Sequence, residues 1–260
     1  MQVSEWPTEF VENLARDFRV ICFENRDMGL SGRCGPNDDS TSFSKLCSDD
    51  IQPSAPYTLF DMRDDILRGL EHLCVKDFAI IGFSMGGMIA QLVAAHAKQR
   101  VTGFAQICSS AGEATAPFPK DALQRFLRTS KGFEAEPEMI DWLTEDLVWC
   151  STPSSLSITE ARKAAQTMIA SGFSSGGYAR QLLAILTAGD RQAHLAEIDA
   201  CSLIIAGNHD RCIETHSSHR AHEIIQNSSL IVFDNMGHAL EPRVLASLSA
   251  WLRETLECPH

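Results

Sequence analysis

The chain has 260 residues, of which 44% are hydrophobic and 22% are charged, as is ordinary for a globular protein with a sizeable core. Its formal net charge is −12 at pH 7. An acidic surface repels phosphate backbones and anionic lipid headgroups, so we expect neither a nucleic-acid partner nor docking to an anionic membrane. The nine cysteines are odd in number and include no Cys-x-x-Cys pair, which predicts reduced thiols rather than a disulfide framework.

Neither a secretory signal nor a membrane span is visible in the sequence. The first ten residues lack a basic stretch followed by an apolar run. Phe78–Ala97 contains no Lys, Arg, Asp or Glu, but its glycines and its change of periodicity favour a buried strand followed by a buried helix. We therefore expect a cytoplasmic protein without a membrane span. The sequence does not specify an oligomeric state.

The first part of the chain predicts two helices, one strand and a long loop. Apolar residues at helical spacing favour a helix within Trp6–Asp17, and the β-branched apolar run Arg19–Glu24 favours a strand. Asn25–Ser31 is typical of a turn, and Gly32–Pro56, rich in Gly, Pro, Ser and Asp, is typical of a surface loop. Leu59–Leu73 follows with one apolar face and predicts an amphipathic helix.

Strands and helices alternate in two later parts of the chain. This order predicts an α/β fold, a mostly parallel sheet covered by helices on both faces. The expected strands are Asp77–Gly82, Val101–Cys108, Leu203–Gly207 and Leu230–Phe233, and the expected helices are Met85–Lys98, Ile213–Gln226 and Glu241–Leu256.

Ala114–Ala196 interrupts this alternation with helical patterns and no clear strand. We interpret it as an inserted helical cap, which leaves residues 1–113 and 197–260 as the core. Its aromatic side chains could line a substrate pocket or form the core of the lobe itself: Phe118, Phe126, Trp142, Trp149 and Phe173.

The pentapeptide Gly82-Phe83-Ser84-Met85-Gly86 has the pattern G-x-S-x-G, with an apolar strand before it and a helix of small residues after it. A sharp strand-to-helix turn lifts a serine hydroxyl above the sheet edge, and the glycines let strand and helix approach closely. The helix amides point at the same place and suit a developing oxyanion. We interpret Ser84 as a nucleophile; the alternative is a serine that only caps the helix.

A serine nucleophile needs a base and an acid that orients the base. His238 follows the apolar run Leu230–Phe233, and Asp210 follows the run that ends at Gly207, so both should lie at the carboxyl edge of the sheet. The chain order Ser, Asp, His agrees with this assignment. Glu113 follows the strand near Cys108 and is a rival for the acid.

A second histidine pattern, His216, His219 and His222, suggests a metal site at first sight. Steps of three residues spread the side chains across a helix face, so they converge poorly on one ion. His209, beside Asp210, is more typical of a solvated loop. We therefore expect neither a metal nor another cofactor.

Five segments together resemble the α/β-hydrolase superfamily, and the Asn-Arg-Asp-x-Gly-x-Ser turn with Trp6-Pro7 is similar to the subgroup of aclacinomycin methylesterases. The segments are Phe18–Ser31, Ile80–Gln91, Ala188–Arg191, Ala206–Asp210 and Asn235–His238. The resemblance implies a carboxylic-ester hydrolase with a helical cap, a small-molecule ester as substrate and no cofactor. It also implies a Ser84–Asp210–His238 triad, with the amide of Met85 as an oxyanion donor.

The chain departs from this family at its front. Such families place an earlier strand and a Gly-containing loop before the position of Trp6, and that loop supplies a second oxyanion amide. We therefore expect an N-terminally shortened hydrolase fold whose first strands are absent. The strands Arg19–Glu24 and Phe78–Ile81 would then pair directly or leave a gap, and the protein would be a weak esterase of marginal stability.

Three functions stay open from the sequence. The first is an active serine esterase that works through an acyl-enzyme. The second is a weak or inactive binding protein that retains the fold. The third uses the same triad on an amide, a lactone or a carbon–carbon bond, because the fold alone does not choose among these reactions.

Overall fold

The computed structural model describes residues 2–48, 54–113, 118–152 and 155–257. Contacts divide the chain into two compact units. The first unit comprises Met1–Thr58 and Phe118–Thr187, and the second comprises Leu59–Pro117 and Ala188–His260. Among the described residues, no helix is both long and apolar enough to cross a membrane.

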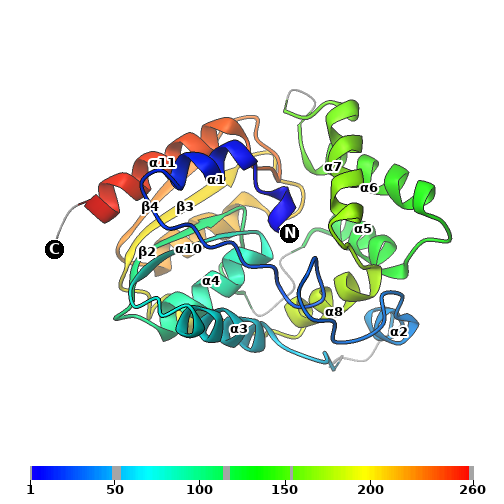
Figure 1. Cartoon of the computed structure of the whole chain (residues 1–260), viewed down its shortest axis with the longest axis horizontal. Helices are drawn as coiled ribbons and strands as arrows, with labels where there is room; N and C mark the ends of the chain where they lie inside the picture. The colour runs from blue at the N-terminus through cyan, green and yellow to red at the C-terminus, as the bar shows by residue number, and fades with distance from the viewer. Residues whose placement is uncertain (1, 49–53, 114–117, 153–154, 258–260) are drawn as a thin grey trace. The chain divides into compact units, whose positions relative to one another are not determined.

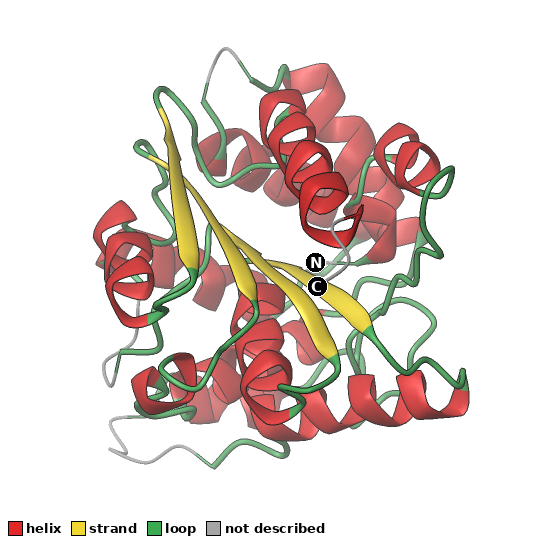
Figure 2. Ribbon diagram, turned by 90° about the vertical axis from the view of Figure 1, so that its left-hand side faces the viewer, coloured by secondary structure: helices red, strands yellow, loops and turns green. Residues whose placement is uncertain are grey.

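A four-stranded parallel sheet forms the centre of the second unit (Figure 1). Its strands are β1 (Phe78–Phe83), β2 (Val101–Ile107), β3 (Cys201–Gly207) and β4 (Ser228–Phe233), arranged in that order. All four lie within two residues of the predicted runs. Figure 2 shows the strands fanned about one another, which is the twist expected of a parallel sheet. The predicted α/β fold with a parallel sheet is confirmed.

Helices pack on both faces of this sheet (Figure 1). On one face, a core cluster joins Ala90 of α4 (Met85–His96), Phe104 of β2 and Ala221 of α10 (Thr215–Ile224). Gly103 precedes Phe104 and therefore points to the opposite face, where α11 (Pro242–Glu257) packs. A β-carbon at Gly103 would lie 3.1 Å from the Trp251 ring, so the glycine lets α11 approach the strand closely. Beside α4 lies α3 (Leu59–His72).

The expected strand Arg19–Glu24 is wrong: residues 19–25 have no regular secondary structure. None of these side chains is buried, whereas an inner strand of a parallel sheet is covered on both faces. A β-branched run forms a strand only where a neighbouring backbone completes the hydrogen bonds. Direct pairing with Phe78–Ile81 is therefore also wrong, and β1 pairs only with β2 among the described residues.

The first unit is helical. It contains the 3-10 helix η1 (Val3–Glu5) and the helices α1 (Thr8–Leu14), α2 (Ser40–Leu46), α5 (Lys120–Lys131), α6 (Glu136–Cys150), α7 (Ile158–Ala170) and α8 (Ser175–Leu186). Sequence analysis missed α2, which lies inside the expected loop. Asp39 begins it as N-cap, accepting hydrogen bonds from the amides of Thr41 and Ser42 at 3.1 and 3.0 Å.

The described part of residues 114–196 contains helices and no strand, including the short α9 (Gln192–Leu195) of the second unit. The division into units differs from the expected division into core and cap. Met1–Thr58 groups with the helices of residues 118–187, because the turn after residue 25 contacts α8. Residues 188–196 group with the sheet.

Candidate active site

Ser84 lies at the turn between β1 and α4, with φ 54° and ψ −122°. A residue with a side chain rarely adopts positive φ, and such a conformation costs about 1–3 kcal/mol unless the surroundings hold it. Two hydrogen bonds hold it here: the Ser84 amide donates to the carbonyl of Ile107 at 2.9 Å, and its carbonyl accepts from the amide of Gly87 at 2.9 Å. The strained turn is the local structure that the Gly-x-Ser-x-Gly pattern predicts.

Close backbone approach explains the glycines of this turn. A β-carbon on Gly82 would lie 2.1 Å from the carbonyl oxygen of Gly86, and one on Gly87 would lie 2.6 Å from the Ser109 side chain. The Ser109 hydroxyl also donates to the carbonyl of Ser84 at 2.8 Å. Ser109 therefore fixes the turn from the loop that follows β2, a contact that the sequence did not indicate.

His238 and Asp210 are directly paired. Nδ1 of His238 lies 2.8 Å from Oδ2 of Asp210, and the two side chains are 10% and 2% exposed. The other carboxylate oxygen accepts hydrogen bonds from the amides of Cys212 and Ile213 at 2.8 and 2.9 Å. These two bonds fix the acid independently of the imidazole. With Nδ1 engaged, Nε2 is the ring nitrogen left to accept a proton.

The loops after β3 and β4 bring this pair together. The amide of His209 donates to the carbonyl of Met236 at 2.9 Å, and a β-carbon on Gly207 would lie only 2.2 Å from the same oxygen. The glycine therefore permits the crossing that sets His238 beside Asp210. The side chain of His209 is exposed, as expected.

The imidazole also lies close to the serine turn. The ring of Phe83, which precedes Ser84, has its centroid 4.7 Å from that of His238. No hydrogen bond joins Ser84 to His238 among the described residues. The amide of Met85 belongs to the first turn of α4, where amides lack acceptors within the helix.

Glu113 is engaged elsewhere. Its Oε1 accepts the hydroxyl of Ser217 on α10 at 2.5 Å, and the same hydroxyl oxygen accepts the amide of Ala111 at 2.8 Å. Asp210 is the acid that is bonded to Nδ1 of His238. Glu113, the rival acid, is bonded to Ser217 instead.

The three histidines of α10 do not converge. His216 lies near Glu214, Nδ1 of His222 lies 2.8 Å from the hydroxyl of Ser228, and His219 is exposed. Within the described chain, one group brings three possible metal-ligand atoms within 4.8 Å of one another, and it consists of Cys108, Asp210 and His238.

Comparison with known proteins assigns the chain to one family. The profile of the family described as "alpha/beta hydrolase fold" matches residues 2–240. The chain belongs to this family. The Ser84 turn and the Asp210–His238 pair thus lie in a hydrolase fold.

Curated relatives of this hydrolase include esterases. It is 28% identical over 159 residues to the pimeloyl-[acyl-carrier protein] methyl ester esterase of Xanthomonas oryzae pv. oryzae, a match that covers 61% of this chain and 62% of the esterase. It is 31% identical over 102 residues to rhodomycin D methylesterase DnrP of Streptomyces peucetius, covering 39% of this chain and 29% of that enzyme. The matches thus span less than two thirds of these relatives.

Solved structures share the fold over nearly the full chain. The enol-lactonase from Burkholderia xenovorans LB400 superposes with a TM-score of 0.74 at 20% identity, covering 99% of this hydrolase and 87% of the lactonase. The thermophilic esterase from Thermogutta terrifontis also gives 0.74 at 20% identity, covering 98% and 86%. At this identity the likeness shows the fold alone.

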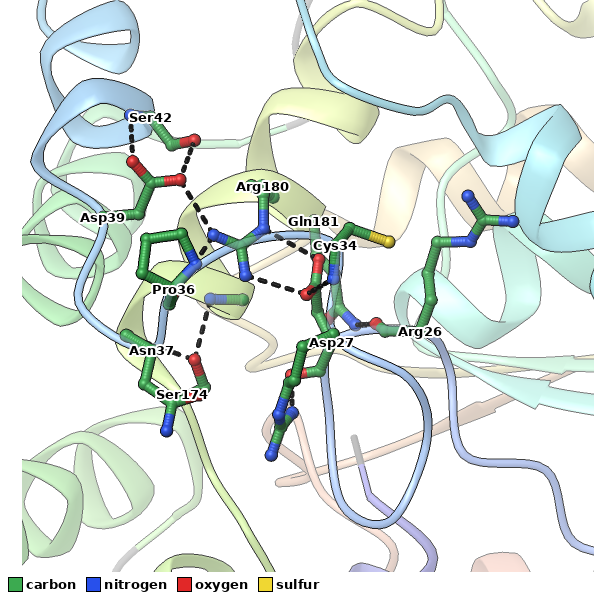
Figure 3. Close-up of polar contacts among 12 residues, drawn as sticks. Arg26, Asp27, Cys34, Pro36, Asn37, Asp39, Ser42, Ser174, Arg180 and Gln181 are labelled. Atoms are coloured by element: carbon green, nitrogen blue, oxygen red, sulfur yellow. Dashed lines mark hydrogen bonds and ion pairs between the residues drawn. The ribbon is translucent and has the colours of Figure 1, made fainter.

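A buried charge network in the first unit was missed by sequence analysis (Figure 3). Arg180 of α8 donates to both carboxylate oxygens of Asp27, with Nε 2.9 Å and Nη2 2.8 Å away. Its Nη1 lies 2.8 Å from Asp39 and 3.1 Å from the carbonyl of Pro36. The side chains of Arg180 and Asp27 are 1% and 0% exposed. A lone charge among the small and apolar residues of α8 was the available signal.

The aromatic side chains of the helical segment pack on one another within the first unit. The rings of Phe118 and Phe126 lie 5.0 Å apart, edge to face. The guanidinium of Arg125 lies over Trp142 at 4.7 Å and near Trp149 at 5.0 Å. These aromatic side chains are all partly exposed, so the contacts show packing within the unit but not a buried core.

Proposed function

We propose that this hydrolase cleaves a carboxylic ester of a small molecule, with Ser84 as nucleophile, His238 as general base and Asp210 as the orienting acid. The hydrogen bond between Asp210 and His238 carries the proposal, because it fixes a base at the same sheet edge as the strained Ser84 turn. A serine that only capped α4 would not require the strained turn or the paired imidazole.

In the proposed reaction, the Ser84 hydroxyl attacks the ester carbonyl carbon while Nε2 of His238 takes its proton. The carbonyl oxygen becomes an oxyanion, which the Met85 amide stabilises together with the first turn of α4. Asp210 holds the imidazole in the tautomer with its proton on Nδ1 and stabilises the imidazolium that forms. The intermediate then expels the alcohol, which receives the proton from His238.

The second half of the reaction releases the acid. A water molecule gives a proton to His238 and attacks the acyl-enzyme carbonyl. The second tetrahedral intermediate then breaks its bond to Ser84 and releases the acid, while His238 returns the proton to the Ser84 oxygen. No metal or other cofactor enters either half. The relatives do not support the expectation that a shortened front makes this chain a weak esterase.

The names of the relatives guide the choice of substrate. Two of them are named as methyl esterases, so an ester with a small alcohol is the preferred substrate class. A third is the 3-oxoadipate enol-lactonase 2 of Acinetobacter baylyi, and a lactone is an internal ester open to the same attack. We also propose that the helical segment 114–196 acts as the cap that selects the substrate.

A fluorophosphonate probe distinguishes this proposal from a binding protein of the same fold. We expect the probe to label the wild-type chain once and to leave Ser84→Ala unlabelled. Ser229 lies exposed on β4, and Ser229→Ala should be labelled like the wild type. Hydrolysis of a short nitrophenyl ester, a methyl ester, a lactone and an amide by the same three proteins then identifies the bond that is cleaved.

Labelling that persists in Ser84→Ala would assign the nucleophile elsewhere. Absence of labelling in all three folded proteins would favour the binding protein. Rapid cleavage of an amide with slow cleavage of every ester would replace the substrate class while retaining the triad.

A further inference from the structure

Cys108 is a buried thiol directly after β2 that the proposed mechanism does not use. It is 1% exposed and has a positive φ of 48°. Its amide donates to the carbonyl of Ile205 on the neighbouring strand at 2.8 Å, which continues the sheet pairing by one residue. The positive φ means that Cys108 does not continue the in–out alternation of side chains along β2.

The thiol lies between the two polar partners of the active site. Its sulfur is 3.9 Å from the carbonyl oxygen of Gly237, the residue directly before His238. The sulfur, a carboxylate oxygen of Asp210 and a ring nitrogen of His238 all lie within 4.8 Å of one another. Cys108 therefore lies beside the acid and is hydrogen-bonded to the backbone that carries the base.

The thiol is neutral at this place. Burial raises the pKa of Cys108 well above its ordinary value, and the neighbouring Asp210 carboxylate raises it further. A neutral thiol is a poor nucleophile and a poor metal ligand, because both roles need the thiolate. It is, however, a donor of one weak hydrogen bond, and the Gly237 carbonyl oxygen accepts it.

Resting on the proposed function, we propose that Cys108 is a positioning residue of the triad, whose S–H group donates to the Gly237 carbonyl while its sulfur packs beside the Asp210 carboxylate, so that both stay in place around His238. Asp210 is already fixed on one side by two amides that meet its Oδ1. The thiol supports the pair from the β2 side. Without that support the acid and the loop carrying His238 gain freedom, and a misplaced base slows the chemical step more than it weakens substrate binding.

Three variants test this role. Cys108→Ala removes the donor, whereas Cys108→Ser replaces it with a hydroxyl donor. Cys201→Ala is the control, because Cys201 begins β3 at the opposite end of the sheet and its sulfur lies 3.8 Å from the Thr255 hydroxyl. On a short nitrophenyl ester we expect Cys108→Ala to lower kcat by about tenfold with KM changed by less than about twofold. Cys108→Ser should retain most of the activity, and Cys201→Ala should match the wild type.

A second measurement does not depend on activity. A histidine Nδ1–H bound to a carboxylate gives a proton resonance far downfield, and we expect it in the wild type, Cys108→Ser and Cys201→Ala. In Cys108→Ala it should move upfield or broaden. A separate outcome is a wild type that shows this resonance but neither reacts with the fluorophosphonate probe nor hydrolyses the ester. That result would refute the esterase proposal, and the resonance alone would still test the positioning role.

Two results would overturn the positioning role. One is a folded Cys108→Ala with the kcat and the downfield resonance of the wild type. The other is a folded Cys108→Ser that has lost as much kcat and resonance as Cys108→Ala, because the size of the side chain would then matter rather than its donor. The serine variant keeps the test decisive if the alanine variant does not fold.

Discussion

Replacing Arg180 with Met is expected to destabilise the first unit by about 3–5 kcal/mol, because it leaves a buried carboxylate without its counter-ion. Asp27 is fully buried and has two hydrogen bonds from Arg180. After the substitution, Asp27 retains the amide of Cys34, 2.7 Å from Oδ1. Met fills much of the lost volume, so the loss reports charge and hydrogen bonding rather than a cavity.

Arg162 supplies the matched control. It forms an ion pair with Asp141 at 2.7 Å, but the two side chains are 50% and 61% exposed. Exposed pairs contribute about 0–1 kcal/mol, so Arg162→Met should lose no more than that. Against a total stability of about 5–15 kcal/mol, the loss in Arg180→Met is large enough to measure by urea unfolding.

Tryptophan fluorescence makes the assay specific for the first unit. Of the four tryptophans, Trp6, Trp142 and Trp149 belong to that unit, and Trp251 belongs to the second. Unfolding followed by fluorescence should therefore shift to lower urea in Arg180→Met. Equal midpoints for Arg180→Met and Arg162→Met would refute the inference that the buried pair holds this unit together.

The same pair predicts a pH dependence. Burial alone would raise the pKa of Asp27, but hydrogen bonds from Arg180 and from the Cys34 amide, with the charge of Arg180, hold that pKa below its ordinary 3.8. A carboxylate whose pKa is lowered by folding contributes stability that is present above about pH 4 and lost as pH falls through the folded value. The free-energy difference between wild type and Arg180→Met should therefore shrink below about pH 4. A difference that is constant down to about pH 3 would contradict this origin.

Two further pairs of substitutions test the site. Asp210→Asn should lower kcat by about 10⁴-fold because it disturbs the tautomer of His238, while Glu113→Gln should keep kcat within about tenfold of the wild type. Ester hydrolysis by the two folded variants decides which residue is the acid. Equal losses of kcat would contradict the assignment of Asp210. Gly82→Ala should destabilise the protein by at least about 3 kcal/mol because its β-carbon meets the backbone of Gly86. The β-carbon of Gly86→Ala would meet open space, so this variant should be neutral or should stabilise α4 by up to about 1 kcal/mol. Thermal unfolding measures both variants. A Gly82→Ala as stable as the wild type would mean that the turn relaxes.

The sheet unit could be predicted because its signals are local. Each strand is a short apolar run, and the residues proposed for catalysis follow three of those runs within a few residues. Parallel strands bring their carboxyl ends to one edge, so sequence position alone indicated that Ser84, Asp210 and His238 would be neighbours. Asp210 also follows β3 by three residues, which favoured it as the acid, and its carboxylate lies beside His238.

The contacts that sequence analysis missed depend on distant partners. Arg180 and Asp27 are 153 residues apart, and no local pattern pairs them. The same holds for Cys108, whose contact with Gly237 spans 129 residues. The helix α2 is different, because its N-cap Asp39 was a local signal in a segment whose polarity suggested a loop.

Arg19–Glu24 shows why a strand pattern can fail while the site beside the sheet is retained. A strand needs a partner for its backbone groups, whereas the serine turn and the Asp210–His238 pair need only close approaches between segments of one unit. Gly82 permits the first approach and Gly207 permits the second, and both crossings involve residues of the second unit. The conformation of residues 19–25 therefore does not enter the hydrogen bonds that shape the proposed triad, and the proposed chemistry rests on the four strands and the loops that follow them.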